Sequence, residues 1–106
     1  MAWIMLTIAG ILEVVWAYSM KLSDGFTRPW PTGVTFVTMA ASFALLSFAM
    51  RTLPLGTAYM IWTGIGAVGA FIVGVTVLGE GATPGRLAAA ALIVSGIVLM
   101  KLSTDG

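Results

Sequence analysis

The chain has 106 residues, of which 59% are hydrophobic and 8% are charged, and its formal net charge is +1. A soluble domain carries about a quarter of charged residues, so this composition indicates a single membrane domain over residues 1–106. The small net charge, with no basic run, gives no reason to expect a nucleic-acid partner. Cys and His are both absent, which excludes a disulfide framework and argues against a transition-metal site.

Four apolar segments are each long enough to cross a bilayer as a helix, which takes about 20 residues. The predicted helices cover residues 3–22, 31–50, 57–78 and 84–101, with loops containing Gly and Pro between them. The predicted fold class is therefore an all-α membrane protein with four transmembrane helices in each protomer.

The first predicted helix has one carboxylate, Glu13, near its middle. At 1.5 Å per residue, Glu13 lies roughly 15 Å from either membrane surface, and its short side chain cannot reach water from there. An ionisable group at that depth is costly unless it faces a cavity or a partner, so it indicates a functional site. The alternative is a buried glutamate that is hydrogen-bonded for structural reasons only.

Loop charges bear on the orientation of the chain in the membrane. Four spans put both termini on one side, together with Arg51 and Lys101, whereas Lys21, Arg28 and Arg86 lie on the other side. Orientation follows the Lys and Arg bias of short loops, and here the bias is nearly absent. The sequence therefore predicts insertion both ways round. Because a protomer this small can hardly enclose a polar cavity, we expect an antiparallel, dual-topology homodimer, which is an inverted repeat of the kind many transporters use.

Two motifs resemble the small multidrug resistance transporters over nearly the whole chain. They are Gly10-x-x-Glu13-Val14-x-Trp16-Ala17 in the first helix and Pro54-x-Gly56-x-Ala58-Tyr59-x-x-Trp62-x-Gly64-x-Gly66 entering the third. The first motif is similar to the subtype that exports guanidinium. The resemblance implies a multi-pass antiporter of the bacterial inner membrane that exchanges protons for guanidinium and acts as an antiparallel dimer.

The resemblance also implies roles for individual residues. Glu13 would be the shared proton and substrate carboxylate. The substrate pocket would be shaped by Gly10, Trp16, Ser42, Tyr59 and Trp62, and the third helix would kink at Gly64 and Gly66. Tyr18 and Ser19 are polar where the family usually has aliphatic residues.

Guanidinium suits a carboxylate because its fork of donors makes paired, charge-assisted hydrogen bonds. Burial and a like-charged neighbour disfavour the charged form of a carboxylate, so each Glu13 of a dimer should hold a proton readily when no substrate is bound. Protons and the cation would then compete for one site, which couples their exchange.

The neighbouring side chains each have two interpretations. Trp16 lies one turn from Glu13, where its ring can hold a cation by cation–π attraction or pack against lipid. The depth of Tyr59 and Trp62 fits an interfacial belt as well as a pocket. Ser42 can donate to Glu13 or to its own helix backbone. Gly64 and Gly66 can serve close packing or a hinge.

Other functions remain to be separated from guanidinium export. An exporter of quaternary ammonium or other multidrug cations is the nearest alternative. A proton-conducting ring subunit is a remote one, because such proteins usually have two helices with the acid in the second. No nucleophile with a base, metal cluster or phosphate loop is evident, so we expect neither an enzyme nor a cofactor. The expected partners are small cations, protons, the bilayer and a second copy of the chain.

Overall fold

The computed structural model describes residues 1–104, which form four helices. These are α1 (Ala2–Leu22), α2 (Pro29–Ala49), α3 (Leu55–Thr76) and α4 (Pro84–Ser103). Each is long and apolar enough to cross a membrane, and the described residues contain no strand. The prediction of an all-α protein with four helices able to span a membrane is confirmed.

The helix ends differ from the predicted ones by up to two residues. Helix α2 begins at Pro29 instead of residue 31, because proline is tolerated throughout a first turn, where backbone N–H groups have no helical partner. Helix α3 likewise begins directly after its N-cap Pro54. At α4, Thr83 caps the helix by accepting a hydrogen bond from the Arg86 amide, which fits the predicted Thr-Pro start.

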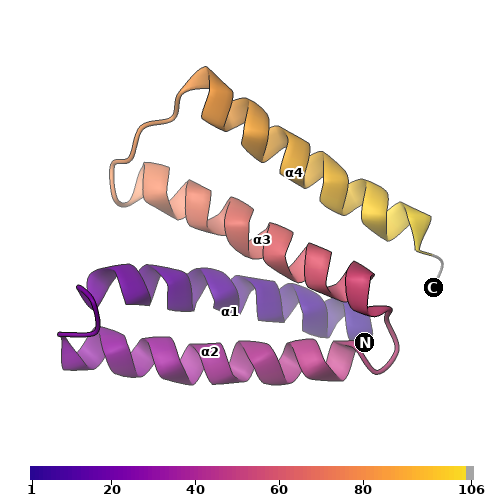
Figure 1. Cartoon of the computed structure of the whole chain (residues 1–106), viewed down its shortest axis with the longest axis horizontal. Coiled ribbons are helices and arrows are strands. Elements are labelled where there is room, and N and C mark those ends of the chain that lie inside the picture. Colours follow the sequence, from indigo (N-terminus) through magenta and orange to yellow (C-terminus); the bar gives the residue numbers. More distant parts are fainter. Residues whose placement is uncertain (105–106) are drawn as a thin grey trace.

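The helices run up and down in a flat layer whose Cα atoms span 43 × 34 × 16 Å (Figure 1). Helix α1 packs against both α2 and α3, whereas the backbone of α4 approaches only α3 within residues 1–104. The buried core lies among the first three helices and the loop after α2: Leu6, Ala9, Leu46, Ala49, Leu53, Ala58, Ile61 and Trp62. No described residue of α4 is buried. One long face of α4 is therefore left without a neighbour among residues 1–104.

Glycines allow the close approach of the helices. A Cβ atom added at Gly10 of α1 would lie 2.6 Å from Ile65 of α3, and one added at Gly64 of α3 would lie 2.7 Å from Ile97 of α4. Real Cβ atoms do not come this close, so these positions need a residue without a side chain. Small residues at such contacts are typical of helices that associate in lipid.

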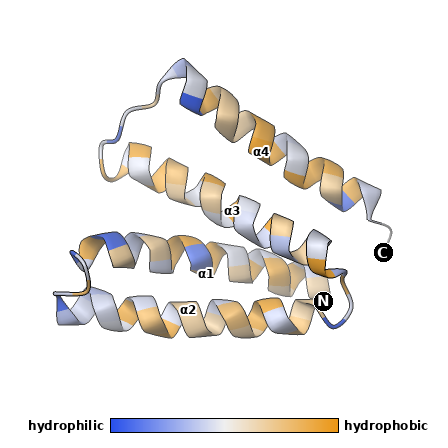
Figure 2. Ribbon diagram, in the orientation of Figure 1, coloured by the Kyte–Doolittle hydropathy of each residue, from blue (hydrophilic) through white to orange (hydrophobic). Residues whose placement is uncertain are grey.

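The hydropathy of the residues varies along the helices. Figure 2 shows hydrophilic colour in parts of the loops and at some helix ends, and one strongly hydrophilic turn near the middle of α1. Glu13 is the charged residue in the middle of that helix in the sequence. The start of α1, the end of α4 and the loop between α2 and α3 lie at one edge of the layer, and the other two loops lie at the opposite edge (Figure 1).

Candidate functional site

Glu13 projects from α1 onto α3, where it lies against Gly66. A Cβ atom added at Gly66 would overlap the Glu13 carboxylate. The Oε1 atom of Glu13 is buried and has no hydrogen-bond partner among the described residues. A buried carboxylate oxygen without a donor is unfavourable, so this atom is suited to receive a proton or a cation.

The need for glycine at position 66 is thus explained by the Glu13 carboxylate, which occupies the space of a side chain there. The kink of α3 at Gly64 and Gly66 stays a prediction. In the structure the two residues face different neighbours. Gly66 faces Glu13 of α1, and Gly64 faces Ile97 of α4. Helix α3 is continuous from Leu55 to Thr76, and both glycines are buried in contacts between helices.

Trp16 lies one turn beyond Glu13, on the face that residues three and four apart share. Its indole Nε1 is buried and has no hydrogen-bond partner within residues 1–104. Its ring meets Phe43 of α2 edge to face, with centroids 6.4 Å apart and an interplanar angle of 68°. Because a buried indole N–H normally has a partner, Trp16 presents a second unsatisfied polar group near Glu13.

Ser42 connects α1, α2 and α3 through two hydrogen bonds. Its hydroxyl donates to the Ala9 carbonyl at 2.7 Å and accepts from Trp62 Nε1 at 2.9 Å. The single hydroxyl hydrogen of Ser42 therefore points to the Ala9 carbonyl. Neither predicted role, donation to Glu13 or donation to its own helix, describes this serine. Ser42 instead fixes the orientation of the Trp62 ring.

Aromatic rings continue from this serine toward Glu13 and toward the surface. Trp62, which is 6% exposed, lies 5.7 Å from the Phe43 ring and 5.6 Å from the Tyr59 ring. Phe43 also contacts Trp16. Tyr59 is 52% exposed and Phe43 is 47% exposed. The predicted pocket residues Trp16, Tyr59 and Trp62 therefore belong to one aromatic cluster that opens on one side.

Phe43 is the member of this cluster that sequence analysis missed. Its ring contacts both Trp16 and Trp62 and so joins α1 to α3 through α2. The available signal was its position: like Trp16, it is an aromatic residue near the middle of a span, too deep for an interfacial belt.

Gly10 and the two polar residues after Ala17 lie outside the cluster. Gly10 is buried beneath Ile65, where it serves the contact between α1 and α3. Ser19 is buried, and Tyr18 lines a groove toward the loop between α3 and α4 together with Lys21 and Glu80. Tyr18, Lys21 and Glu80 thus bring polar groups to a groove that is otherwise lined by apolar residues.

Comparison with known proteins shows the family of this chain. The family model described as Small Multidrug Resistance protein matches residues 1–94. The chain belongs to the small multidrug resistance family. The family assignment confirms the resemblance found in the sequence and makes the chain a multi-pass membrane transporter, which disfavours the ring-subunit alternative.

Individual members of the family match over almost the full length. The guanidinium exporters of Citrobacter freundii and Salmonella typhimurium are each 60% identical over 104 residues, which is 98% of this chain and 99% of each relative. The guanidinium exporter of Escherichia coli (strain K12) is 59% identical over the same length.

Proposed function

We propose that this protein is a proton-coupled antiporter that exports guanidinium across the bacterial inner membrane. The observation that carries the proposal is the buried Glu13 oxygen, which has no hydrogen-bond partner in the described chain. Guanidinium as the substrate is supported by the names of relatives that are 59% and 60% identical. A proton and a cation would occupy the same carboxylate in turn.

The chemistry of the site fits a small planar cation. Glu13 supplies acceptors for the donor fork of guanidinium, and the face of Trp16 can attract a cation, with a contribution of about 2 kcal/mol when desolvated. The hydrogen bond from Trp62 to Ser42 holds one wall of the cluster in place. In this proposal Ser42 positions an aromatic wall and does not transfer a proton.

The functional unit proposed here is an antiparallel homodimer that brings two Glu13 carboxylates together. Three observations support it. The protomer is a layer with a thickness of only 16 Å between Cα atoms, the aromatic cluster is open on one side, and α4 has no buried residue among those described. A second copy in the opposite orientation would close the cluster and supply the second acceptor, as in other inverted-repeat transporters.

Transport by purified protein in liposomes tests the proposal directly. We expect guanidinium uptake driven by a proton gradient, with little uptake of a bulky aromatic cation. Glu13→Gln keeps the shape of the side chain but cannot ionise, so it should abolish proton-driven uptake in a protein that still folds. Glu13→Asp should retain part of the binding.

Two results would contradict the proposal. Undiminished proton-driven uptake by Glu13→Gln would show that Glu13 takes no part in the exchange. A preference of the wild type for bulky aromatic or quaternary ammonium ions would make it a multidrug exporter instead.

A further inference from the structure

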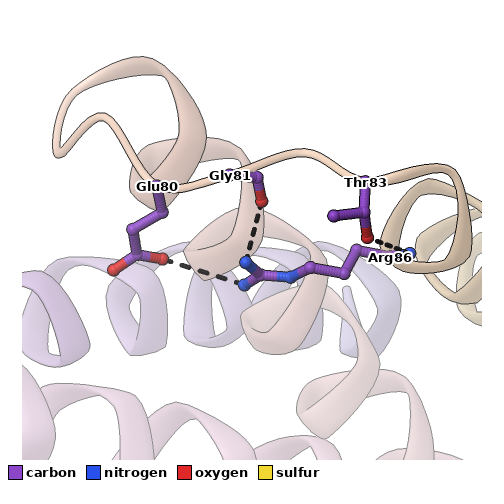
Figure 3. A network of polar contacts seen from close by, with 4 residues as sticks. All are labelled: Glu80, Gly81, Thr83 and Arg86. Atoms are coloured by element: carbon purple, nitrogen blue, oxygen red, sulfur yellow. Dashed lines mark hydrogen bonds and ion pairs between the residues drawn. The ribbon is translucent and has the colours of Figure 1, made fainter.

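The loop between α3 and α4 holds a guanidinium group that belongs to the protein itself. Arg86, in the first turn of α4, donates from Nη1 to the Gly81 carbonyl at 2.8 Å and places Nη2 4.0 Å from Glu80 Oε1 (Figure 3). Its Cζ lies 5.6 Å from the centre of the Phe71 ring of α3. A carboxylate, a carbonyl and an aromatic face thus converge on one planar cation.

The backbone builds this arrangement without help from the Arg86 side chain. Gly79 has a φ of 73°, a left-handed conformation that closes helices at their carboxyl ends. The turn lets the Glu80 amide donate to the Gly74 carbonyl at 2.9 Å. Gly74 has no side chain, and a Cβ atom there would overlap the Glu80 carboxylate. Glu80 is therefore placed by the end of α3.

From these contacts we infer that Glu80, the Gly81 carbonyl and Phe71 form a second guanidinium-binding site, in which the Arg86 side chain is a tethered and exchangeable occupant. A free guanidinium ion has the same planar charge and the same donors as the Arg86 head group, so it can make the same three contacts. The site rests on the loop and not on Glu13. Only the identity of its physiological ligand rests on the proposed function.

The resident cation is weakly held, which permits exchange. The side chains of Arg86 and Glu80 are 49% and 43% exposed, and ion pairs at such positions contribute about 0–1 kcal/mol. A group on a short flexible tether competes at an effective concentration in the millimolar range. Free guanidinium should therefore displace Arg86 at concentrations of roughly millimolar order. Displacement would release one of the contacts between α4 and α3.

Removing the tethered group should expose the site. We would label the Glu13→Gln/Arg86→Ala variant with ¹⁵N in detergent micelles and titrate it with guanidinium chloride up to about 20 mM, a range set by the expected effective concentration, against sodium chloride of equal strength. The Glu13→Gln change removes exchange at the central carboxylate. We expect saturable shifts of the backbone amides of residues 80–83, at guanidinium concentrations several-fold lower than in Glu13→Gln alone.

Arg51 offers a matched control. Its Cζ lies 5.5 Å from the Phe48 ring, nearly the same cation–π geometry as at Arg86, but no salt bridge to a carboxylate is found for it in the described chain. In the Glu13→Gln background, Arg51→Ala should therefore give no saturable shift in residues 49–52. Adding Glu80→Gln to the Arg86→Ala variant should abolish the shifts at residues 80–83.

A second measurement needs no substitution at Arg86. In Glu13→Gln, the side-chain ¹⁵N resonances of Arg86 should move toward those of a solvated arginine as guanidinium is added, with sodium chloride having no such effect. The inference is overturned if the shifts at residues 80–83 do not saturate, if they survive Glu80→Gln, or if the Arg86 resonances do not respond. None of these results would change the outcome of the liposome test of Glu13. Failure of the liposome test would likewise not argue against the second site at Glu80.

Discussion

The Ser42 hydroxyl is a single group on which two helices depend. It satisfies the Ala9 carbonyl of α1 and the Trp62 indole of α3. Ser42→Ala leaves the Trp62 indole N–H buried without a hydrogen bond, at a cost of about 1–3 kcal/mol for an unsatisfied group, and removes the bond that the Ala9 carbonyl accepts from α2. We expect a lower unfolding temperature in detergent and weaker guanidinium binding, since the Trp62 ring loses its fixed orientation.

Ser47, an exposed serine of the same helix, provides the control. Ser47→Ala should leave both quantities unchanged. Equal effects of the two substitutions would mean that the hydrogen bonds of Ser42 do not contribute to stability or to guanidinium binding.

Trp16 should govern selection more than folding. Trp16→Ala opens the space beside Glu13 and removes the ring that meets Phe43. We expect weaker guanidinium transport and relatively better transport of larger cations in liposomes. Trp16→Phe keeps a ring but removes the buried N–H, so it should retain most of the selectivity. Unchanged transport of both cation sizes by Trp16→Ala would assign this ring to lipid packing.

The shared site at Glu13 predicts a definite pH dependence. Cation binding needs the ionised carboxylate, so protons compete with guanidinium and the apparent affinity falls as pH falls. In the range where one proton leaves for each cation bound, the dissociation constant should rise roughly tenfold for each unit of pH lost, and more steeply if two protons leave. Binding measured by calorimetry that stays flat from acidic to alkaline pH would contradict a shared site.

At the scale of the helices, Gly66 determines whether α3 can accommodate the Glu13 carboxylate. Gly66→Ala places a Cβ atom where that carboxylate lies, so Glu13 must move away from its position. We expect guanidinium binding to weaken by at least about tenfold, equivalent to about 1.4 kcal/mol. Gly56→Ala, on the same helix and with nothing within 4 Å of an added Cβ, should bind normally. Normal binding by Gly66→Ala would show that the carboxylate is free to relocate.

The helices themselves were predictable because their signal is local. Hydropathy over about 20 residues marks a span, and prolines and glycines mark its ends, so the four helices in the structure differ from the predicted ranges by no more than two residues at either end. The depth of Glu13 also follows from its position in a span. These features need no knowledge of which helix is a neighbour.

The partners of the site residues could not be predicted in the same way. The contact between Gly66 and Glu13 and the hydrogen bond from Ser42 to Ala9 join residues far apart in the chain. Each depends on the rotation of one helix against another, which a hydropathy pattern over a short window does not fix. Sequence analysis therefore identified Ser42 but named two acceptors for its hydroxyl, Glu13 and its own helix, neither of which is the Ala9 carbonyl of the structure, and it missed Phe43 entirely.

At the scale of the whole molecule, the flat layer and the balance of charges point to the same assembly. Arg51 follows the end of α2 and Lys101 lies in the last turn of α4, whereas Lys21, Arg28 and Arg86 lie at the end of α1, the start of α2 and the start of α4. The ends of α2 and α4 lie at one edge of the layer and the other three at the opposite edge (Figure 1). The Nζ atom of Lys101 also lies 4.9 Å from the centre of the Trp3 ring, so α4 contacts the start of α1 at this edge. With so little bias between the edges, we expect neither orientation to be strongly preferred.

Insertion in both orientations is therefore our prediction for the wild type. A tag after Gly106, which lies outside the described residues, should be accessible from both sides of the membrane in one population of cells. Thr52→Lys with Ser103→Lys adds positive charge at the terminal edge and should hold that edge in the cytoplasm. Thr27→Lys with Ala82→Lys adds it at the opposite edge and should reverse the orientation.

Each biased variant alone should lose guanidinium export, because an antiparallel dimer needs both orientations in the same membrane. Co-expression of the two variants should restore export, and this recovery distinguishes loss of a partner from damage caused by the added lysines. Two copies of the same biased variant expressed together provide the control and should remain inactive. A tag found on one side only in the wild type, or full export by either biased variant alone, would contradict the antiparallel homodimer while leaving the role of Glu13 open to its own test.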